Sequence, residues 1–193
     1  MFERYNKVQR AVLETTLRII NQKELQATSM SLIAKESKVS TGSIYHYFQS
    51  KEDIINELYK AIVTFTGDVV MKDIDANQPV QARFRRVWEN IIGVSMKHPE
   101  GFQFIEQYSF SPYIYEESKL EAYKVGWCNP VEKLYSEAIE QKLFIDMEPK
   151  LLVQMHYGSI VYLVKADLQK YIELTEDAVQ HVITSAWKSV LRS

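Results

Sequence analysis

The sequence predicts an all-α fold, in which an N-terminal helix-turn-helix domain is followed by a larger helical domain. Six glycines and five prolines among 193 residues are few, and sparse breakers favour long helices over many short strands and turns. Apolar residues recur with helical spacing along most of the chain, and no segment of useful length alternates with the period of a strand. Serine or threonine precedes several of these segments, where a hydroxyl can cap a helix.

The first helix is predicted over Glu3–Gln22, because Leu13, Leu17 and Ile20 fall on one helical face. Two short helices and a tight turn follow. Thr28 or Ser29 caps the first short helix, and residues 37–40 form the turn.

Ser40 caps the second short helix, Thr41–Phe48. Ser50 then caps a longer helix that begins at Lys51 and fades near Asp73. The later helices are predicted over Val80–Lys97, Phe102–Phe110, Glu116–Gln141, Pro149–Lys170 and, capped by Thr175, Glu176–Leu191.

Two prolines bear on the boundaries of these later helices. Residues 98–101, which include Pro99, are expected to stop the helix before them. Pro130 lies inside Glu116–Gln141, so either the helix kinks there or Asn129 caps a new helix with Pro130 at its first position. In total, the sequence predicts eight to ten helices.

The composition is that of an ordinary globular protein, with 46% hydrophobic and 25% charged residues. The net charge is −2, but its distribution is uneven. Residues 1–51 hold eight Lys or Arg against four Glu, whereas the remainder holds 15 basic against 21 acidic residues. This imbalance places any attraction for phosphate at the N-terminal end, although a charge fluctuation of this size also arises by chance.

Several classes of function are not supported by any motif. Cys128 is the single cysteine, so no internal disulfide and no zinc-ligand spacing are available. The sequence has no nucleophile elbow, phosphate loop or evident pair of catalytic carboxylates, which predicts a protein without cofactor or enzyme activity. A signal peptide and an apolar run of roughly 20 residues are also missing, which predicts a cytoplasmic protein with no membrane partner.

The two short capped helices form a helix-turn-helix over about residues 29–48, and this motif predicts binding to double-stranded DNA. Ile44 and Phe48 are one turn apart and anchor the inner face, while Gly42 permits close approach of the backbone to DNA. The expected DNA-binding residues are Ser29, Ser31, Ser40, Thr41, Gly42, Ser43, Tyr45, His46, Tyr47 and Lys51.

These residues divide by the part of the DNA that they are expected to contact. Thr41, Ser43 and His46 are candidates for base edges, although a histidine here is as often simply solvated. The hydroxyls of Ser40, Tyr45 and Tyr47 are candidates for phosphate. The two tyrosines cannot both point inward with Ile44 and Phe48, so at least one should be exposed.

Lys51 stands in the first turn of the following helix, where N–H groups and the helix dipole favour an anion. This position makes Lys51 a candidate phosphate contact. The alternative is an ordinary surface lysine.

Three strings in this region resemble the TetR family of bacterial transcriptional regulators: Thr28–Lys35, Val39–Phe48 and Ser50–Ile54. They follow one another at the family spacing without gaps. Two residues depart from the family pattern, which has glycine where this chain has Glu24 and Lys38. A left-handed residue other than glycine costs roughly 1 kcal/mol, which a packed domain tolerates.

The resemblance implies a division of the chain into a DNA-binding domain, residues 1–50, and a helical ligand-binding and dimerisation domain, residues 51–193. Family members sense a small molecule in the second domain and dimerise through their last two helices. The expected ligand-binding residues are Trp88, Phe104, Tyr108, Tyr123, Trp127 and His156. The alternative for each is an ordinary place in the core, and the apolar face of the last helix can likewise pack within one chain.

The function that follows is a ligand-responsive repressor. A homodimer binds its operator, and a small apolar or aromatic effector shifts the helix that begins at Lys51 and so releases the DNA. The alternative is a helical small-molecule carrier or enzyme in which the DNA-binding head is vestigial.

Overall fold

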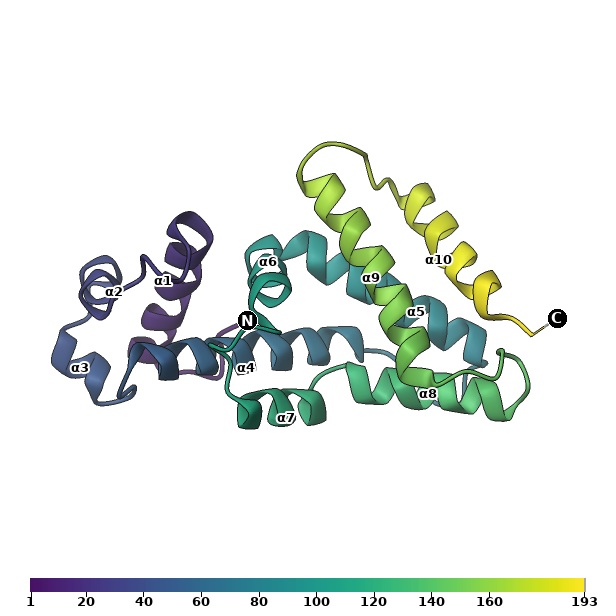
Figure 1. Cartoon of the computed structure of the whole chain (residues 1–193), viewed down its shortest axis with the longest axis horizontal. Coiled ribbons are helices and arrows are strands. Elements are labelled where there is room, and N and C mark those ends of the chain that lie inside the picture. The colour runs from purple at the N-terminus through teal and green to yellow at the C-terminus, as the bar shows by residue number, and fades with distance from the viewer. Residues whose placement is uncertain (193) are drawn as a thin grey trace. The chain divides into compact units, whose positions relative to one another are not determined.

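The computed structural model describes residues 1–192, and that part of the chain folds into ten α-helices (Figure 1). A single bridge between Phe144 and Leu191 is the one β-type pairing among these residues. The all-α prediction is therefore confirmed. The helices are α1 Lys7–Lys23, α2 Met30–Ser37, α3 Thr41–Tyr45, α4 Lys51–Val70, α5 Val80–Lys97, α6 Pro99–Tyr108, α7 Glu116–Val125, α8 Cys128–Glu140, α9 Pro149–Leu168 and α10 Glu176–Val190.

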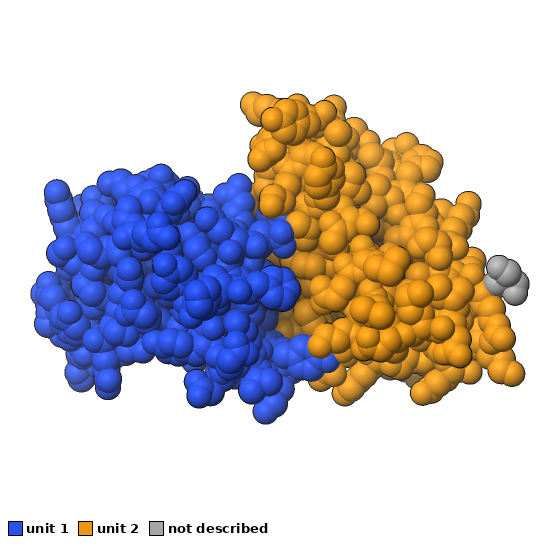
Figure 2. Space-filling model, in the orientation of Figure 1, with its two compact units in different colours: residues 1–65, 100–125 blue, residues 66–99, 126–193 orange. Residues whose placement is uncertain are grey.

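The chain forms two compact units (Figure 2). Unit 1 comprises residues 1–65 and 100–125, and unit 2 comprises residues 66–99 together with the chain from residue 126 onward. These units are defined by compactness, whereas the predicted boundary at residue 50 separates a DNA-binding part from a ligand-binding part. That functional boundary stays a prediction.

Unit 1 has a single core, built by α1–α4 together with the segment that holds α6 and α7. Leu13, Ile33 and Ile44 are fully buried in it, and Phe104 and Ile114 from the second segment join the same cluster. Apolar burial of this kind is the main force that holds the unit together.

The buried Asn56 of α4 adds hydrogen bonds within unit 1. Its side-chain amide donates to the Tyr113 carbonyl oxygen at 3.0 Å and accepts from the Tyr115 N–H at 2.8 Å. Segment 100–125 is thus held to α4 by polar contacts as well as by the core.

Unit 2 is built around aromatic side chains from α5, α8 and α10. Trp88 and Phe84 of α5 pack with Tyr135 of α8 and with Phe144, which lies just after α8. Trp187 of α10 closes the cluster, with its ring centroid 5.1 Å from those of Phe84 and Phe144. Edge-to-face pairs at these distances add to the stabilisation from burial.

The predicted helix starts hold where a hydroxyl caps the helix. Ser29, Ser40 and Thr175 each accept a hydrogen bond from a backbone N–H three residues ahead. The helix before Pro99 ends at Lys97, as predicted, but α6 already begins at Pro99 instead of Phe102. At Pro130 a new helix forms, but Pro130 is its third residue and the N-cap is Trp127, not Asn129.

Candidate nucleic-acid interface

Helices α2 and α3 pack against each other and against α1, which fixes the helix-turn-helix as a small three-helix arrangement (Figure 1). Ile33 of α2 and Ile44 of α3 are fully buried, and Phe48 is 4% exposed. The predicted anchors Ile44 and Phe48 therefore point inward. The opposite faces of the two short helices are left toward solvent.

α3 is shorter than predicted, because it ends at Tyr45 and residues 46–48 continue as a turn. The Tyr47 N–H donates to the Ile44 carbonyl oxygen at 3.0 Å, a tighter pairing than in an α-helix. The Phe48 N–H donates to the same Ile44 carbonyl oxygen at 2.9 Å, so Phe48 keeps the helical spacing that turns its ring toward the core.

The structure brings the predicted DNA-binding residues together on one motif and exposes nearly all of them. Tyr45 is 51% exposed and Tyr47 is 41% exposed, so both tyrosines face outward. The His46 ring lies edge-on to Tyr47, with centroids 4.7 Å apart. The exposed members of the set are Ser29, Ser31, Ser40, Thr41, Gly42, Ser43, Tyr45, His46 and Tyr47, while Lys51 is half-buried.

Four of these serines form two hydroxyl pairs that the sequence did not reveal. Oγ of Ser40 lies 2.8 Å from Oγ of Ser43, and Oγ of Ser29 lies 3.0 Å from Oγ of Ser31. The first serine of each pair also caps its helix. Each mutual hydrogen bond uses one of two hydroxyl protons, so each pair keeps one proton to donate outward. A phosphate oxygen or a base acceptor fits such a donor.

The N-terminus of α4 is capped from both sides. Oγ of Ser50 accepts from the Asp53 N–H at 3.0 Å, as predicted for a cap at Ser50. The Asp53 carboxylate in turn accepts from the N–H groups of Gln49 and Ser50, both at 3.1 Å. These bonds fix the start of α4 at Lys51.

Glu24 and Lys38, where the family pattern has glycine, both have positive φ. Lys38 ends α2 at φ 57° and ψ 26°, which is the left-handed helical region. Glu24 ends α1 at φ 64° and ψ 163°, which only glycine adopts readily. Both departures in the sequence thus coincide with backbone that favours glycine.

The six predicted ligand-binding residues are divided between the units. Phe104, Tyr108 and the half-exposed Tyr123 belong to unit 1, where the Phe104 and Tyr108 rings lie 5.3 Å apart in the core. The Tyr108 hydroxyl also accepts from the Leu25 N–H at 3.3 Å. Phe104 and Tyr108 are therefore core residues, and contact of any of the three with a ligand stays a prediction.

The other three predicted residues lie together in unit 2. The Trp88 ring centroid is 6.4 Å from that of Trp127 and 5.8 Å from that of His156. Trp88 and His156 are buried. Burial lowers the pKa of His156 to about 4, so the ring is neutral at pH 7. Whether a ligand reaches this cluster also stays a prediction.

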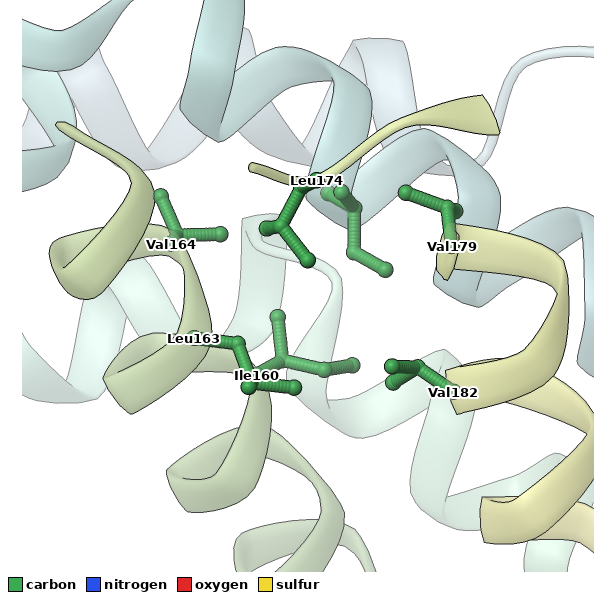
Figure 3. A pocket seen from close by; sticks show the side chains of 7 residues that line it. Ile160, Leu163, Val164, Leu174, Val179 and Val182 are labelled. Atoms are coloured by element: carbon green, nitrogen blue, oxygen red, sulfur yellow. The ribbon is translucent and has the colours of Figure 1, made fainter. Parts of the chain in front are cut away.

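A pocket in unit 2 is lined by other residues than these. It is a narrow space between α5, α9 and α10 that has no room for a water molecule, and its wall is purely aliphatic (Figure 3). Figure 3 shows side chains of α9 and α10 facing each other across this space. The lining residues are Ile92, Ile160, Leu163, Val164, Leu174, Val179 and Val182.

Within residues 1–192, none of the helices combines the length and the apolar character that crossing a membrane requires. In the same part of the chain, no three His, Cys, Asp or Glu side chains are grouped so that they can hold a metal ion.

Comparison with known proteins matches both parts of the chain. Residues 12–58 match the family described as "Bacterial regulatory proteins, tetR family", and residues 79–191 match "Tetracyclin repressor-like, C-terminal domain". An HTH-type transcriptional regulator of Haemophilus influenzae is 24% identical over 184 residues, which is 93% of each chain. BetI of Vibrio parahaemolyticus is 37% identical over 71 residues, 34% of this chain and 36% of BetI. A TetR-family regulator from Marinobacter aquaeolei has the same fold, with TM-score 0.89 at 22% identity and full coverage of both chains.

The helix-turn-helix with its exposed polar face, on an all-helical chain that matches transcriptional regulators, defines a DNA-binding transcriptional regulator. The second family match alone spans more than half of the chain. The chain belongs to the TetR family of bacterial transcriptional regulators, as its sequence resemblance predicted.

Proposed function

We propose that this chain is a repressor that binds its operator as a homodimer and releases it when a small apolar or aromatic effector binds. The observation that carries the proposal is the outward face of α2 and α3. Hydroxyl and imidazole groups are exposed there on a backbone whose anchors, Ile33, Ile44 and Phe48, are buried. A rigid polar face of this size fits a major groove about 12 Å wide.

Within this face, we assign base reading to Thr41, Ser43 and His46. Ser40, Tyr45 and Tyr47 donate to phosphates, which sets the register of the motif on the duplex. Lys51 binds a further phosphate together with the amides of the first turn of α4. The serine pairs support these roles, because each keeps one outward proton.

A homodimer is supported by the outer face of α9. Leu151, Met155 and Tyr162 are 53%, 61% and 75% exposed, and their spacing places them on one stripe. A Cβ built on Gly158, in the same stripe, meets no atom within 4 Å. A second copy that covers this apolar stripe provides the partner, and two-fold symmetry then presents two recognition helices to two half-sites.

The last helix contributes less to this face than the sequence suggested. Ile183 and Val190 are buried, and Trp187 packs on Phe84 inside the unit. The apolar side of α10 thus packs largely within its own chain. We therefore place α9 at the centre of the dimer contact, with α10 at its edge.

Effector binding acts, in this proposal, through α4, which begins at Lys51 beside the recognition motif and runs on into unit 2. A shift of α4 changes the spacing of the two heads and lowers affinity for the operator. The protein acts in the cytoplasm and has no enzyme activity.

Selection of bound duplexes from a random pool tests the proposed function. The repressor should recover a pseudo-palindromic site with half-sites about one helical turn apart. The competing function is a small-molecule carrier or enzyme with a vestigial head, which would bind an apolar molecule but no DNA. Failure to enrich any sequence, together with tight binding of an apolar molecule, would favour that alternative.

The response to effector needs a separate measurement. A library of apolar and aromatic compounds is screened for a rise in the melting temperature, and each binder is added to the operator complex. A binder that lowers operator affinity supports the repressor. Binders that leave the affinity unchanged contradict the coupling but not DNA binding.

A further inference from the structure

A chain of hydrogen bonds runs through unit 2 from α5 to α10. The Trp88 indole donates to the Tyr135 hydroxyl at 3.0 Å, and this hydroxyl lies 2.5 Å from Nδ1 of His156. On the other side of the ring, Nε2 of His156 lies 3.2 Å from Oγ of Ser189. Ser189 donates to the Ala186 carbonyl oxygen at 2.8 Å. One imidazole therefore links side chains from α5, α8, α9 and α10.

The chemistry of the two ends fixes the direction of every proton in this chain. An indole N–H can only donate, so the Tyr135 oxygen accepts from Trp88. At the other end, the Ser189 proton goes to the Ala186 carbonyl oxygen, so Oγ of Ser189 accepts from Nε2 of His156. The neutral ring has only that one proton, so Nδ1 is unprotonated and accepts from the Tyr135 hydroxyl. A proton on Nδ1 would meet the Tyr135 proton head-on, and the chain would break there.

The surroundings of His156 favour the neutral ring. Within the described residues it contacts the rings of Phe84, Trp88 and Tyr135, with centroids 5.7 to 5.8 Å away, and the hydroxyl of Ser189. Tyr135 is the one titratable group among these contacts, and burial raises its pKa, so it stays protonated. Burial lowers the pKa of His156 from 6.5 to about 4.

We propose that His156 is a pH-sensitive positioning residue. While its ring is neutral, it holds the C-terminal end of α10 to the core through Ser189. When the ring is protonated, the charge and the new Nδ1 proton cannot stay among the aromatic rings and against the Tyr135 proton, so the ring moves toward water and its bond to Ser189 is lost. α10 ends at Val190, directly after Ser189. This end is also attached by the Trp187 ring contacts and the buried Val190 side chain. Two backbone hydrogen bonds add to these, from the Ile145 N–H to the Val190 carbonyl oxygen and from the Arg192 N–H to the Leu143 carbonyl oxygen, both at 2.9 Å. None of these contacts titrates, so the pH response belongs to His156.

Amide hydrogen exchange of the full chain between pH 7 and pH 5, corrected for the intrinsic pH dependence of exchange, tests the proposal. The released ring takes up a proton with a pKa near 6.5, and the held ring with a pKa of about 4. The released fraction of α10 should therefore rise about 20-fold from pH 7 to pH 5. The amides of α1, in unit 1, are the internal reference and should not respond.

His156→Gln keeps a side-chain acceptor and donor but does not titrate, so the rise should vanish in this variant. His181→Gln is the matched control, because His181 lies on α10 itself with its side chain 76% exposed. The rise should persist in this variant.

If His156→Gln does not fold, ¹⁵N NMR of the unmodified chain at pH 6 decides the matter. The expected result is a neutral His156 with its proton on Nε2. A proton on Nδ1, or exchange of α10 that does not respond to pH, would overturn the proposal.

Discussion

Glu24 is held at φ 64° and ψ 163° by its neighbours rather than by its own preference. Its N–H donates to the Ile20 carbonyl oxygen at 3.0 Å, and the next residue, Leu25, is 1% exposed in the core of unit 1. The chain must turn at this point to bury Leu25 directly after α1. Because a side chain at this φ and ψ is strained, the residue lowers stability where the family pattern has glycine.

Glu24→Gly should therefore raise the free energy of unfolding by about 1 kcal/mol, since release of the strain exceeds the entropy that glycine adds to the unfolded chain. Urea unfolding of the two proteins measures the change. Glu24→Ala removes the carboxylate but keeps the strain, and it should give no comparable gain. Equal stabilisation by both variants would show that the charge, not the backbone, was unfavourable.

Substitutions in the recognition motif should separate the residues that contact base edges from those that contact phosphates. Ser43→Ala should change the preferred base at one position of each half-site, with a cost of about 1–3 kcal/mol on the preferred sequence. Tyr45→Phe, which removes only a phosphate donor, should weaken binding to all sequences similarly. Competition assays with single-base operator variants measure both effects. A uniform loss for Ser43→Ala would assign Ser43 to phosphate instead.

Helices α5 and α8 are joined by a pair of parallel hydrogen bonds from one guanidinium. Arg83 donates from Nη1 to Oε2 of Glu137 at 2.8 Å, and from Nη2 to Oε1. These bonds hold the pKa of Glu137 below its usual 4.5. The Arg83 side chain is 10% exposed and that of Glu137 is 37% exposed, so water screens part of the attraction.

Because the pKa of Glu137 is lowered in the folded state, the pair stabilises unit 2 above about pH 4.5, and the contribution is lost as pH falls below that value. Glu137→Gln should lower the free energy of unfolding by about 1 kcal/mol at pH 7 and by much less at pH 3. Urea unfolding at the two pH values checks this. The same loss at both would mean that shape, not charge, holds the pair.

The elements of this fold could be predicted where a local signal decides them. Val80–Lys97 was predicted to the residue, because proline precedes it and the apolar period is regular. The end of α3 was not, because residues 46–48 keep the helical apolar spacing and contain no breaker, so nothing in the sequence marks the tight turn at Tyr47. The start of α8 at Cys128 was also missed, since Trp127 makes no side-chain cap that a sequence pattern would reveal.

Some features of the candidate site could be predicted from the sequence and others could not. The exposure of the motif could be predicted, since Ile44 and Phe48 determine which side faces inward. The pairing of Ser40 with Ser43 and the link from Asp53 to the N–H groups before α4 depend on rotamers that no spacing specifies. The membership of segment 100–125 in unit 1 rests on contacts far apart in sequence, and periodicity carries no information on these.

At the scale of the whole molecule, the exposed stripe of α9 predicts how the protein assembles. Met155→Glu places a charge in the centre of the stripe, where a second copy would have to bury it, and should raise the dimer dissociation constant at least about 100-fold. Sedimentation equilibrium measures this. Ala82→Glu on the exposed face of α5 is the control and should leave the dimer intact. A Met155→Glu dimer of unchanged affinity would place the interface elsewhere.

The salt dependence of operator binding tests the central claim most directly, that the face of α2 and α3 with Lys51 binds DNA. Affinity for the selected operator should fall steeply with salt, with a log–log slope of about −0.9 for each phosphate contacted. Lys51→Ala should reduce the magnitude of that slope by about one for each protomer bound. Binding that does not respond to salt, or a slope that Lys51→Ala leaves unchanged, would contradict the account.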